Sequence, residues 1–213
     1  MSATPVQTTR SFPKRVVPPI ELPASSAELA AEAAAQLGWD GTVLDMELLG
    51  RRVHVVARLR TAEHAERIAA DIEPVTERAD VATWTWPEFQ ASAPPRAADI
   101  VGVLAVQRHW RTGLASVVPF ARYYSEAAIV LPGSAVLSAD YVDNCLPRAR
   151  AYGLAVVSAD EDAVVDLDLA GRGERLLLNE DSVSRWVNEM VYQQLLAVAD
   201  QNGAAVTTDT IST

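Results

Sequence analysis

The sequence contains few of the residues on which metal-dependent and nucleophilic chemistry depends. Its 213 residues include one cysteine, Cys145, three histidines, and Lys14 as the single lysine. A single cysteine excludes an intramolecular disulfide, a CxxC redox pair and a cysteine-rich metal site. Lys14 lies in a proline-rich segment near the N-terminus, so a rigidly held lysine for Schiff-base, P-loop or nuclease chemistry is not expected.

Long apolar runs are also missing. No stretch approaches about 18 uninterrupted apolar residues, and residues 1–23 lack the apolar centre of a signal peptide. Together with the low cysteine content, this predicts a soluble, cytoplasmic protein that does not associate with a membrane. Arginine takes nearly every basic position, and this bias, with abundant alanine and valine, is typical of a GC-rich genome.

Positive charge is scarce relative to negative charge. The chain has 18 basic and 28 acidic residues, a net charge of −10 at pH 7. A protein that coats nucleic acid usually needs a basic face, so the charge favours a protein partner over a nucleic-acid partner. A local basic strip at strand ends stays open as an alternative, formed by Arg58, Arg60, Arg108 and Arg111.

The composition predicts one folded body with loose ends. Residues 1–23 are basic and rich in Pro, Ser and Thr, and we expect a flexible N-terminal arm. Residues 24–202 are expected to form a single α/β domain, which a 49% hydrophobic content supports. Residues 87–96 contain three prolines and mark the one place for a subdivision. Residues 203–213 are expected to be a flexible tail.

Within that body the hydrophobic pattern changes period several times. Helical spacing predicts helices at 26–37, 61–75, 112–124, 137–152 and 181–200. Alternating or continuous apolar runs predict strands at 42–49, 52–60, 80–86, 99–106, 127–131, 154–158 and 163–169. Strands and helices alternate in the second half, where the strands are solidly apolar. The sequence therefore predicts an α/β fold with a mixed, mostly parallel central sheet and helices on both faces.

The stretch from Arg96 to Leu169 resembles the second half of PD-(D/E)xK, or restriction-endonuclease-like, nuclease domains. The resemblance lies in an Asp that opens an apolar strand, a helix that ends in ARYYSEAAIVLP, and the segment ARAYGLAVVSADEDAVVDLDL. It implies a restriction-endonuclease-like fold. Residues 25–86 separately resemble BON-type and ferredoxin-like modules in the order of their predicted elements, helix-strand-strand-helix-strand. Such modules bind partners or lipids through their surfaces.

The residues that carry the chemistry of the nuclease family are mostly replaced. Such nucleases hold a divalent cation with one carboxylate and with an acid two residues before a lysine on one strand. Asp99 corresponds to the first carboxylate, but Ala105 and Gln107 stand where the second acid and the lysine belong. The resemblance thus implies a nuclease-like domain that has lost its catalytic site.

Other chemistry-bearing residues have simpler interpretations. His54, His64 and His109 have neither i, i+4 nor HxH spacing, so no metal site is expected. We interpret Cys145 as a small buried hydrophobe rather than a nucleophile. The acidic run 160–162 lacks the glycine and terminal glutamate of a calcium loop and is expected to form a hairpin turn.

The tryptophans suggest packing or recognition. Trp84 and Trp86 are two residues apart in the predicted strand 80–86, so both indoles would share one face, either in the core or as an aromatic platform for a partner. Trp186 lies on the apolar stripe of the last predicted helix. We expect that stripe to pack on the chain's own sheet, with pairing to a second subunit as the alternative.

Two functions are consistent with these patterns. The first is a non-catalytic interaction or regulatory protein whose degenerate nuclease-like domain binds a partner protein or a nucleic-acid complex, without a cofactor. The second is an active PD-(D/E)xK-like nuclease with displaced catalytic residues. It would use Mg²⁺, Asp99 and Gln107, with further carboxylates from Asp45, Glu47 or Glu32. The missing lysine and second acid favour the first.

Overall fold

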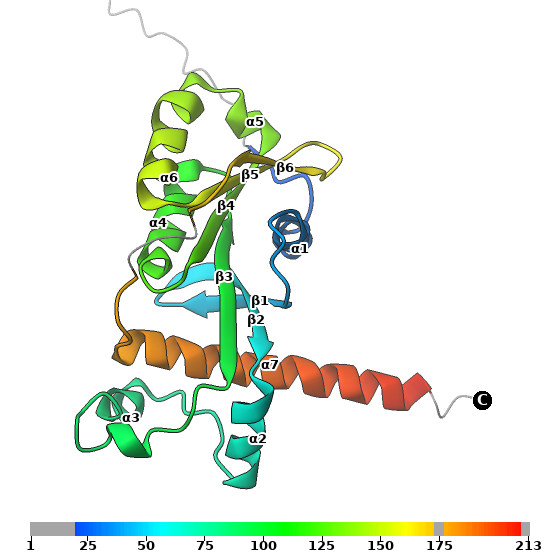
Figure 1. The fold of residues 1–213 in the computed structure, drawn as a ribbon. Coiled ribbons are helices and arrows are strands. Elements are labelled where there is room, and N and C mark those ends of the chain that lie inside the picture. Colours follow the sequence, from blue (N-terminus) through cyan, green and yellow to red (C-terminus); the bar gives the residue numbers. More distant parts are fainter. Residues whose placement is uncertain (1–19, 173–176, 210–213) are drawn as a thin grey trace, which may run out of the picture.

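Six strands form one sheet in which spatial order follows chain order (Figure 1). The computed structural model describes residues 20–172 and 177–209, with side chains described as far as Gln201. The strands are β1 (Thr42–Leu48), β2 (Arg51–Leu59), β3 (Ala98–Val106), β4 (Glu126–Pro132), β5 (Ala155–Ala159) and β6 (Val165–Leu169). Neighbours along the chain are therefore neighbours in the sheet.

Seven α-helices occur in the described residues, together with two short irregular turns. The helices are α1 (Ser26–Gln36), α2 (Thr61–Ala69), α3 (Arg78–Thr83), α4 (Trp110–Ala121), α5 (Gly133–Val136), α6 (Leu146–Tyr152) and α7 (Ser182–Asp209). The turns are the 3₁₀ turn η1 (Gln90–Ser92) and the π-helical turn η2 (Tyr141–Cys145).

Only the pairs β3–β4 and β4–β5 are parallel, while the other three pairs are antiparallel. The fold is α/β as predicted, but the prediction of a mostly parallel sheet is wrong. Parallel pairing needs a crossover connection, and α4 and α6 provide one on either side of β4. The β1–β2 and β5–β6 connections are tight turns. The segment between β2 and β3 packs beyond the end of the sheet, so β3 returns antiparallel to β2 (Figure 1).

Helices cover both faces of the sheet, as predicted (Figure 1). On one face α1 packs through Leu29, Ala30 and Ala33 on side chains of β2 to β6. On the other face α4 and α6 cover β4 and β5, and α7 lies across β1, β2 and β3. Each face therefore buries its own apolar core.

Helix α1 begins and ends where the sequence indicates. The Ser25 hydroxyl accepts a hydrogen bond from the Glu28 amide (3.2 Å), and the Glu28 carboxylate accepts one from the Ser25 amide (3.0 Å). This reciprocal pair is a capping box, which satisfies two amides that the helix leaves free. Gly38 follows the helix in the left-handed conformation (φ +69°) that glycine adopts without strain.

The predicted strand at 80–86 is wrong, since residues 78–83 form the helix α3. A strand is stable only beside a partner strand, and both edges of β2 are already taken by β1 and β3. Val81, the one fully buried residue of α3, anchors this helix instead.

Element boundaries also differ from the prediction, most clearly at three places. Smaller differences occur at α4 and β6, and the predicted helix 137–152 is the π-helical turn η2 followed by α6. The hairpin turn falls on Leu49-Gly50, both at positive φ, one residue before the predicted place. Helix α2 ends at Ala69 rather than near residue 75, since Asp71 takes a left-handed conformation. Helix α7 runs through Gly203 to Asp209, where a tail was expected; one glycine costs a helix only about 1 kcal/mol.

The expected flexible arm falls mostly on residues 1–19, which lie outside the described residues. Its last residues are described, and Leu22 packs partly against the α1 side of the core. None of the helices in the described ranges is long and apolar enough to cross a membrane.

Candidate functional site

The two residues that the nuclease resemblance places in a site lie at opposite ends of β3. Asp99 is near the first residue of the strand, where the Arg58 guanidinium pairs with it (2.7 Å). Gln107 follows the last residue. Eight residues of extended chain span about 26 Å, so the two side chains do not share one cleft.

The other proposed carboxylates lie elsewhere. Asp45 on β1 is held by Arg52 across the hairpin, with Nη2 2.6 Å from Oδ2, and this guanidinium lowers the pKa of the Asp45 carboxyl. Glu47 lies farther along β1, and Glu32 lies on the exposed side of α1. In the described ranges no group of three or more His, Cys, Asp or Glu side chains is placed to hold a metal ion.

The histidines and the cysteine occupy unrelated positions. His54 is buried in β2, and His109 precedes α4 in an exposed position. His64 Nδ1 lies 2.9 Å from the Tyr192 hydroxyl. Cys145 is fully buried, as predicted, and burial and the nearby Asp140 raise the pKa of its thiol to about 11. A thiol with that pKa stays protonated at neutral pH and is a poor nucleophile.

The arginines proposed as a basic strip are mostly neutralised. Arg58, Arg60 and Arg111 form ion pairs with Asp99, Glu63 and Asp140, in that order. The acidic run 160–162 forms the predicted hairpin turn, in which Asp160 Oδ1 accepts hydrogen bonds from the amides of Asp162 and Val164.

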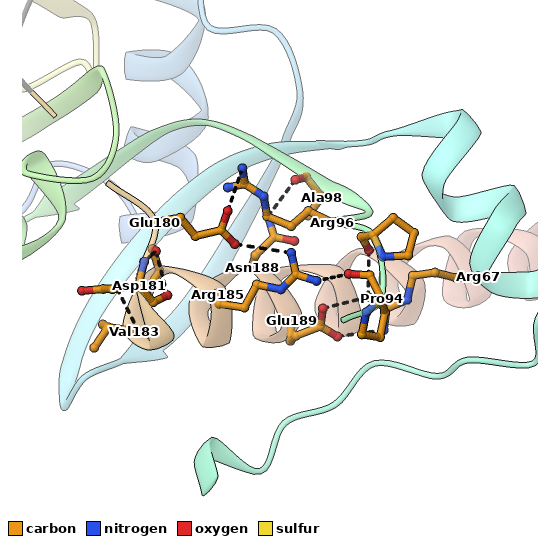
Figure 2. A network of polar contacts seen from close by, with 12 residues as sticks. Arg67, Pro94, Arg96, Ala98, Glu180, Asp181, Val183, Arg185, Asn188 and Glu189 are labelled. Atoms are coloured by element: carbon orange, nitrogen blue, oxygen red, sulfur yellow. Dashed lines mark hydrogen bonds and ion pairs between the residues drawn. The ribbon is translucent and has the colours of Figure 1, made fainter. Parts of the chain in front are cut away.

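A network of hydrogen bonds and ion pairs joins α7 to residues 70–97, called here the clamped segment (Figure 2). Its centre is the Arg67–Glu189 ion pair, in which both side chains are fully buried. Arg67 also donates hydrogen bonds to the carbonyl oxygens of Glu73 (2.8 Å) and Pro95 (3.3 Å), and Glu189 accepts one from the Val75 amide (3.0 Å). One ion pair therefore fixes the backbone at both ends of the segment.

The first turns of α7 hold the segment at further points. Trp186 Nε1 donates to the Thr76 carbonyl (2.7 Å), and Arg185 donates to the Pro94 carbonyl. Asn188 Nδ2 donates to the carbonyl of Ala98, at the start of β3 (2.7 Å). Buried backbone oxygens need such donors, so a segment whose regular structure is limited to α3 and the turn η1 keeps a defined path.

The clamped segment exposes two neighbouring aromatic rings, called here the aromatic tip. Trp86 is 53% exposed and Phe89 is 47% exposed, and their ring centres are 6.1 Å apart. Trp84 is instead half-buried under the Arg185 guanidinium, 5.3 Å from the ring centre. No strand forms here, so the prediction that Trp84 and Trp86 share one face of a strand is wrong.

A hollow of about 350 Å³ lies on the same segment. It is lined by Trp84, Thr85, Gln90, residues 93–95, Glu180 and Arg185. Glu180 is shared by Arg185 (3.3 Å) and Arg96 (3.2 Å). Burial lowers the pKa of Arg185, and its Nε has no hydrogen-bond partner in the described residues. The hollow thus combines an aromatic face with a buried cation.

Sequence reasoning missed the Arg67–Glu189 pair. In α2 the arginine is buried while its neighbour Ile68 is 65% exposed, the reverse of what hydropathy predicts. The sequence of α7 did contain one indication that Glu189 is buried. Glu189 is three residues from both Trp186 and Tyr192, so helical spacing places it on the packed face with them.

Comparisons with protein-family models, with curated proteins and with solved structures found no match for this chain.

Proposed function

We propose that this chain is a non-catalytic interaction protein, whose protein partner docks on the aromatic tip and the adjoining hollow. The observation that carries the proposal is the exposure of Trp86 and Phe89 side by side in a segment whose two ends are held by the buried Arg67–Glu189 pair. Single exposed hydrophobic residues are common, but an adjacent pair of large rings costs solvation free energy that docking would recover.

The hollow beside the tip suits an anchoring side chain of a partner. Interface hot spots are enriched in Trp and Arg and lie next to pockets that a partner side chain fills. Trp84 and Arg185 supply these two residue types, and the clamp holds them in place before binding. A pre-organised surface loses less conformational entropy on binding than a mobile loop does.

The net charge of −10 supports a protein partner over a nucleic-acid partner. The nuclease alternative finds less support, because Asp99 is engaged by Arg58 and lies a strand length from Gln107. No cofactor is required for the proposed role, whereas the alternative would need Mg²⁺.

The test compares the double variant Trp86→Ala/Phe89→Ala with a matched control, Val142→Ala/Leu167→Ala, which removes two exposed apolar side chains from another part of the surface. Tagged proteins would be used to recover partners from the native cell, and each recovered protein would then be titrated in purified form. We expect a partner whose affinity falls at least about tenfold in the tip variant and not in the control. Equal binding by all three proteins would disprove the docking site.

A further inference from the structure

An open groove with an acidic rim lies away from the clamped segment, where β4 and β5 end. Its first part is a hollow of about 470 Å³ whose apolar lining includes Leu22, Pro23, Pro132 and Leu137. Leu137 is 89% exposed, the highest value among the large hydrophobic residues that the structure describes as exposed. This part of the groove therefore presents apolar surface that nothing in the described chain covers.

A second hollow, of about 690 Å³, continues the groove along α1. One wall passes from Leu22 and Pro23 in the first hollow to Ala24 in the second. The other wall is the β5–β6 turn, of which residues 160–161 line the first hollow and residues 162–165 the second. Both walls are thus continuous in sequence from one hollow to the next, and we infer that the two hollows form one elongated groove.

The charged residues that line this groove in the described part of the chain all have one sign. They are six carboxylates, and no arginine, lysine or histidine occurs among the described lining residues. The carboxylates are Glu21, Glu28, Glu32, Asp160, Glu161 and Asp162. None of them takes part in an ion pair between described residues, although eight such pairs occur elsewhere. A groove of this kind suits an extended segment with positive charge and small apolar side chains.

Residues 1–19 of the chain have that chemistry. They contain Arg10, Lys14 and Arg15 and no acidic residue, whereas the rest of the chain has 15 basic and 28 acidic residues. They also contain four prolines, at positions 5, 13, 18 and 19, and the apolar pair Val16-Val17. Proline restricts the backbone before binding, so an extended segment loses less entropy when it docks.

The position of this segment also favours it. The described chain begins at Ile20, and the next three residues line the first hollow. Nineteen extended residues reach up to about 60 Å. A segment tethered directly at its binding groove has an effective concentration in the millimolar range, so weak contacts are enough to hold it.

From these observations we propose that residues 1–19 dock in the acidic groove of their own chain. Arg10, Lys14 and Arg15 would lie against the groove carboxylates, with the proline-rich residues 16–19 over the apolar part. The groove would then be covered by the chain itself. This docking is separate from the aromatic tip, so either proposal can fail without the other.

The test uses the full chain with a nitroxide spin label on Ser11→Cys. Cys145 is fully buried and is not expected to react with the label, which the unsubstituted protein verifies under the same conditions. In ¹⁵N-labelled protein we expect loss of the amide signals of Gly133, Ser134 and Ala163. The loss should disappear in about 1 M NaCl, where the Debye length is about 3 Å.

Two charge variants make the test specific. Neutralising the groove with Glu32→Gln/Glu161→Gln/Asp162→Asn should restore the three signals. The matched control, Glu47→Gln/Glu66→Gln/Glu88→Gln, removes the same charge from exposed positions elsewhere and should not restore them.

Three results would overturn the proposal. One is undiminished signals in the labelled protein, and another is signal loss that survives neutralisation of the groove. The third is that the same signals are lost when spin-labelled ¹⁴N protein is mixed with unlabelled ¹⁵N protein, because the groove would then hold the segment of a second copy.

Discussion

Arg67 and Glu189, which are 122 residues apart in the sequence, form a two-pronged ion pair with no exposed side-chain surface. Nη1 lies 2.7 Å from Oε1 and Nη2 lies 2.8 Å from Oε2. The guanidinium also lies 4.7 Å from the centre of the Tyr192 ring. Because both charges lose their hydration, each depends on the other, and together they determine where the clamped segment lies on α7.

Replacing only one residue of the Arg67–Glu189 pair should lower the free energy of unfolding far more than replacing both residues. Glu189→Ala leaves the buried Arg67 guanidinium unpaired and should lower the free energy of unfolding by about 3–5 kcal/mol. The double variant Arg67→Met/Glu189→Leu should recover most of that loss, since neither charge remains buried alone. Denaturant unfolding measures both. Asp45→Ala, which breaks an exposed pair, should shift the unfolding midpoint far less. A Glu189→Ala protein as stable as the wild type would refute this role.

Gly102→Ala should destabilise the protein because β3 passes directly under the Trp39 ring. A Cβ atom at residue 102 would lie 2.7 Å from that ring, and Trp39 is buried. The ring or the strand must move, at a cost of about 1–3 kcal/mol in unfolding free energy. Gly113→Ala is the control, since its Cβ would lie 3.2 Å from an Ile129 methyl group and alanine favours the helix. Equal stability of the two variants would contradict this packing.

His54 should make the protein less stable in mild acid. Burial lowers the pKa of His54, partly opposed by the charge of Asp45, so the folded pKa lies below the unfolded value of about 6.5. The unfolded chain therefore binds more protons, and the His54 contribution is complete above about pH 6.5 and declines as the pH falls towards the folded pKa. Denaturant unfolding between pH 7 and pH 5 should show this slope. The slope should be shallower in His54→Gln, and an unchanged slope would disprove the assignment.

Trp186→Ala should cost about 3 kcal/mol of unfolding free energy, at the lower end for large-to-small changes because Trp186 is only half-buried. The variant loses packing on the α7 side of the core and the hydrogen bond to the Thr76 carbonyl. By comparison, Trp86→Ala in the aromatic tip should change stability by no more than about 0.5 kcal/mol. If Trp186→Ala were fully stable as a monomer while the wild type formed a dimer, the stripe would be a subunit interface.

The protein should not cleave DNA or RNA in the presence of Mg²⁺ or Mn²⁺. Ala105 and Gln107 stand where the nuclease resemblance requires an acid and a lysine, and Asp99 is paired with Arg58. A gel assay with purified protein and both single- and double-stranded substrates measures this. Cleavage that is abolished by Asp99→Ala would support the nuclease alternative instead.

The local features of this protein were determined by the sequence itself. The Ser25–Glu28 capping box, the solidly apolar strands β3, β4 and β5, and the burial of Cys145 depend on neighbouring residues and hydropathy, which are readable along the chain. These features were predicted at close to their observed positions because short-range hydrogen bonds and apolar spacing act within one element.

Contacts between segments far apart in the sequence decided the direction of β3 relative to β2 and the burial of Arg67. The pairs β1–β2 and β5–β6 are antiparallel because tight turns join them. The pair β2–β3 is antiparallel because the segment between these strands packs on α7 instead of crossing the sheet, and Arg67 and Glu189 hold it there. No pattern within α2 predicts that its arginine is buried and its isoleucine exposed, because the partner that makes this burial favourable is supplied by another helix. Residues 78–83 form a helix for a similar reason: their alternating pattern fits a strand, but in the folded chain they pack on α7, away from the sheet, with Val81 buried.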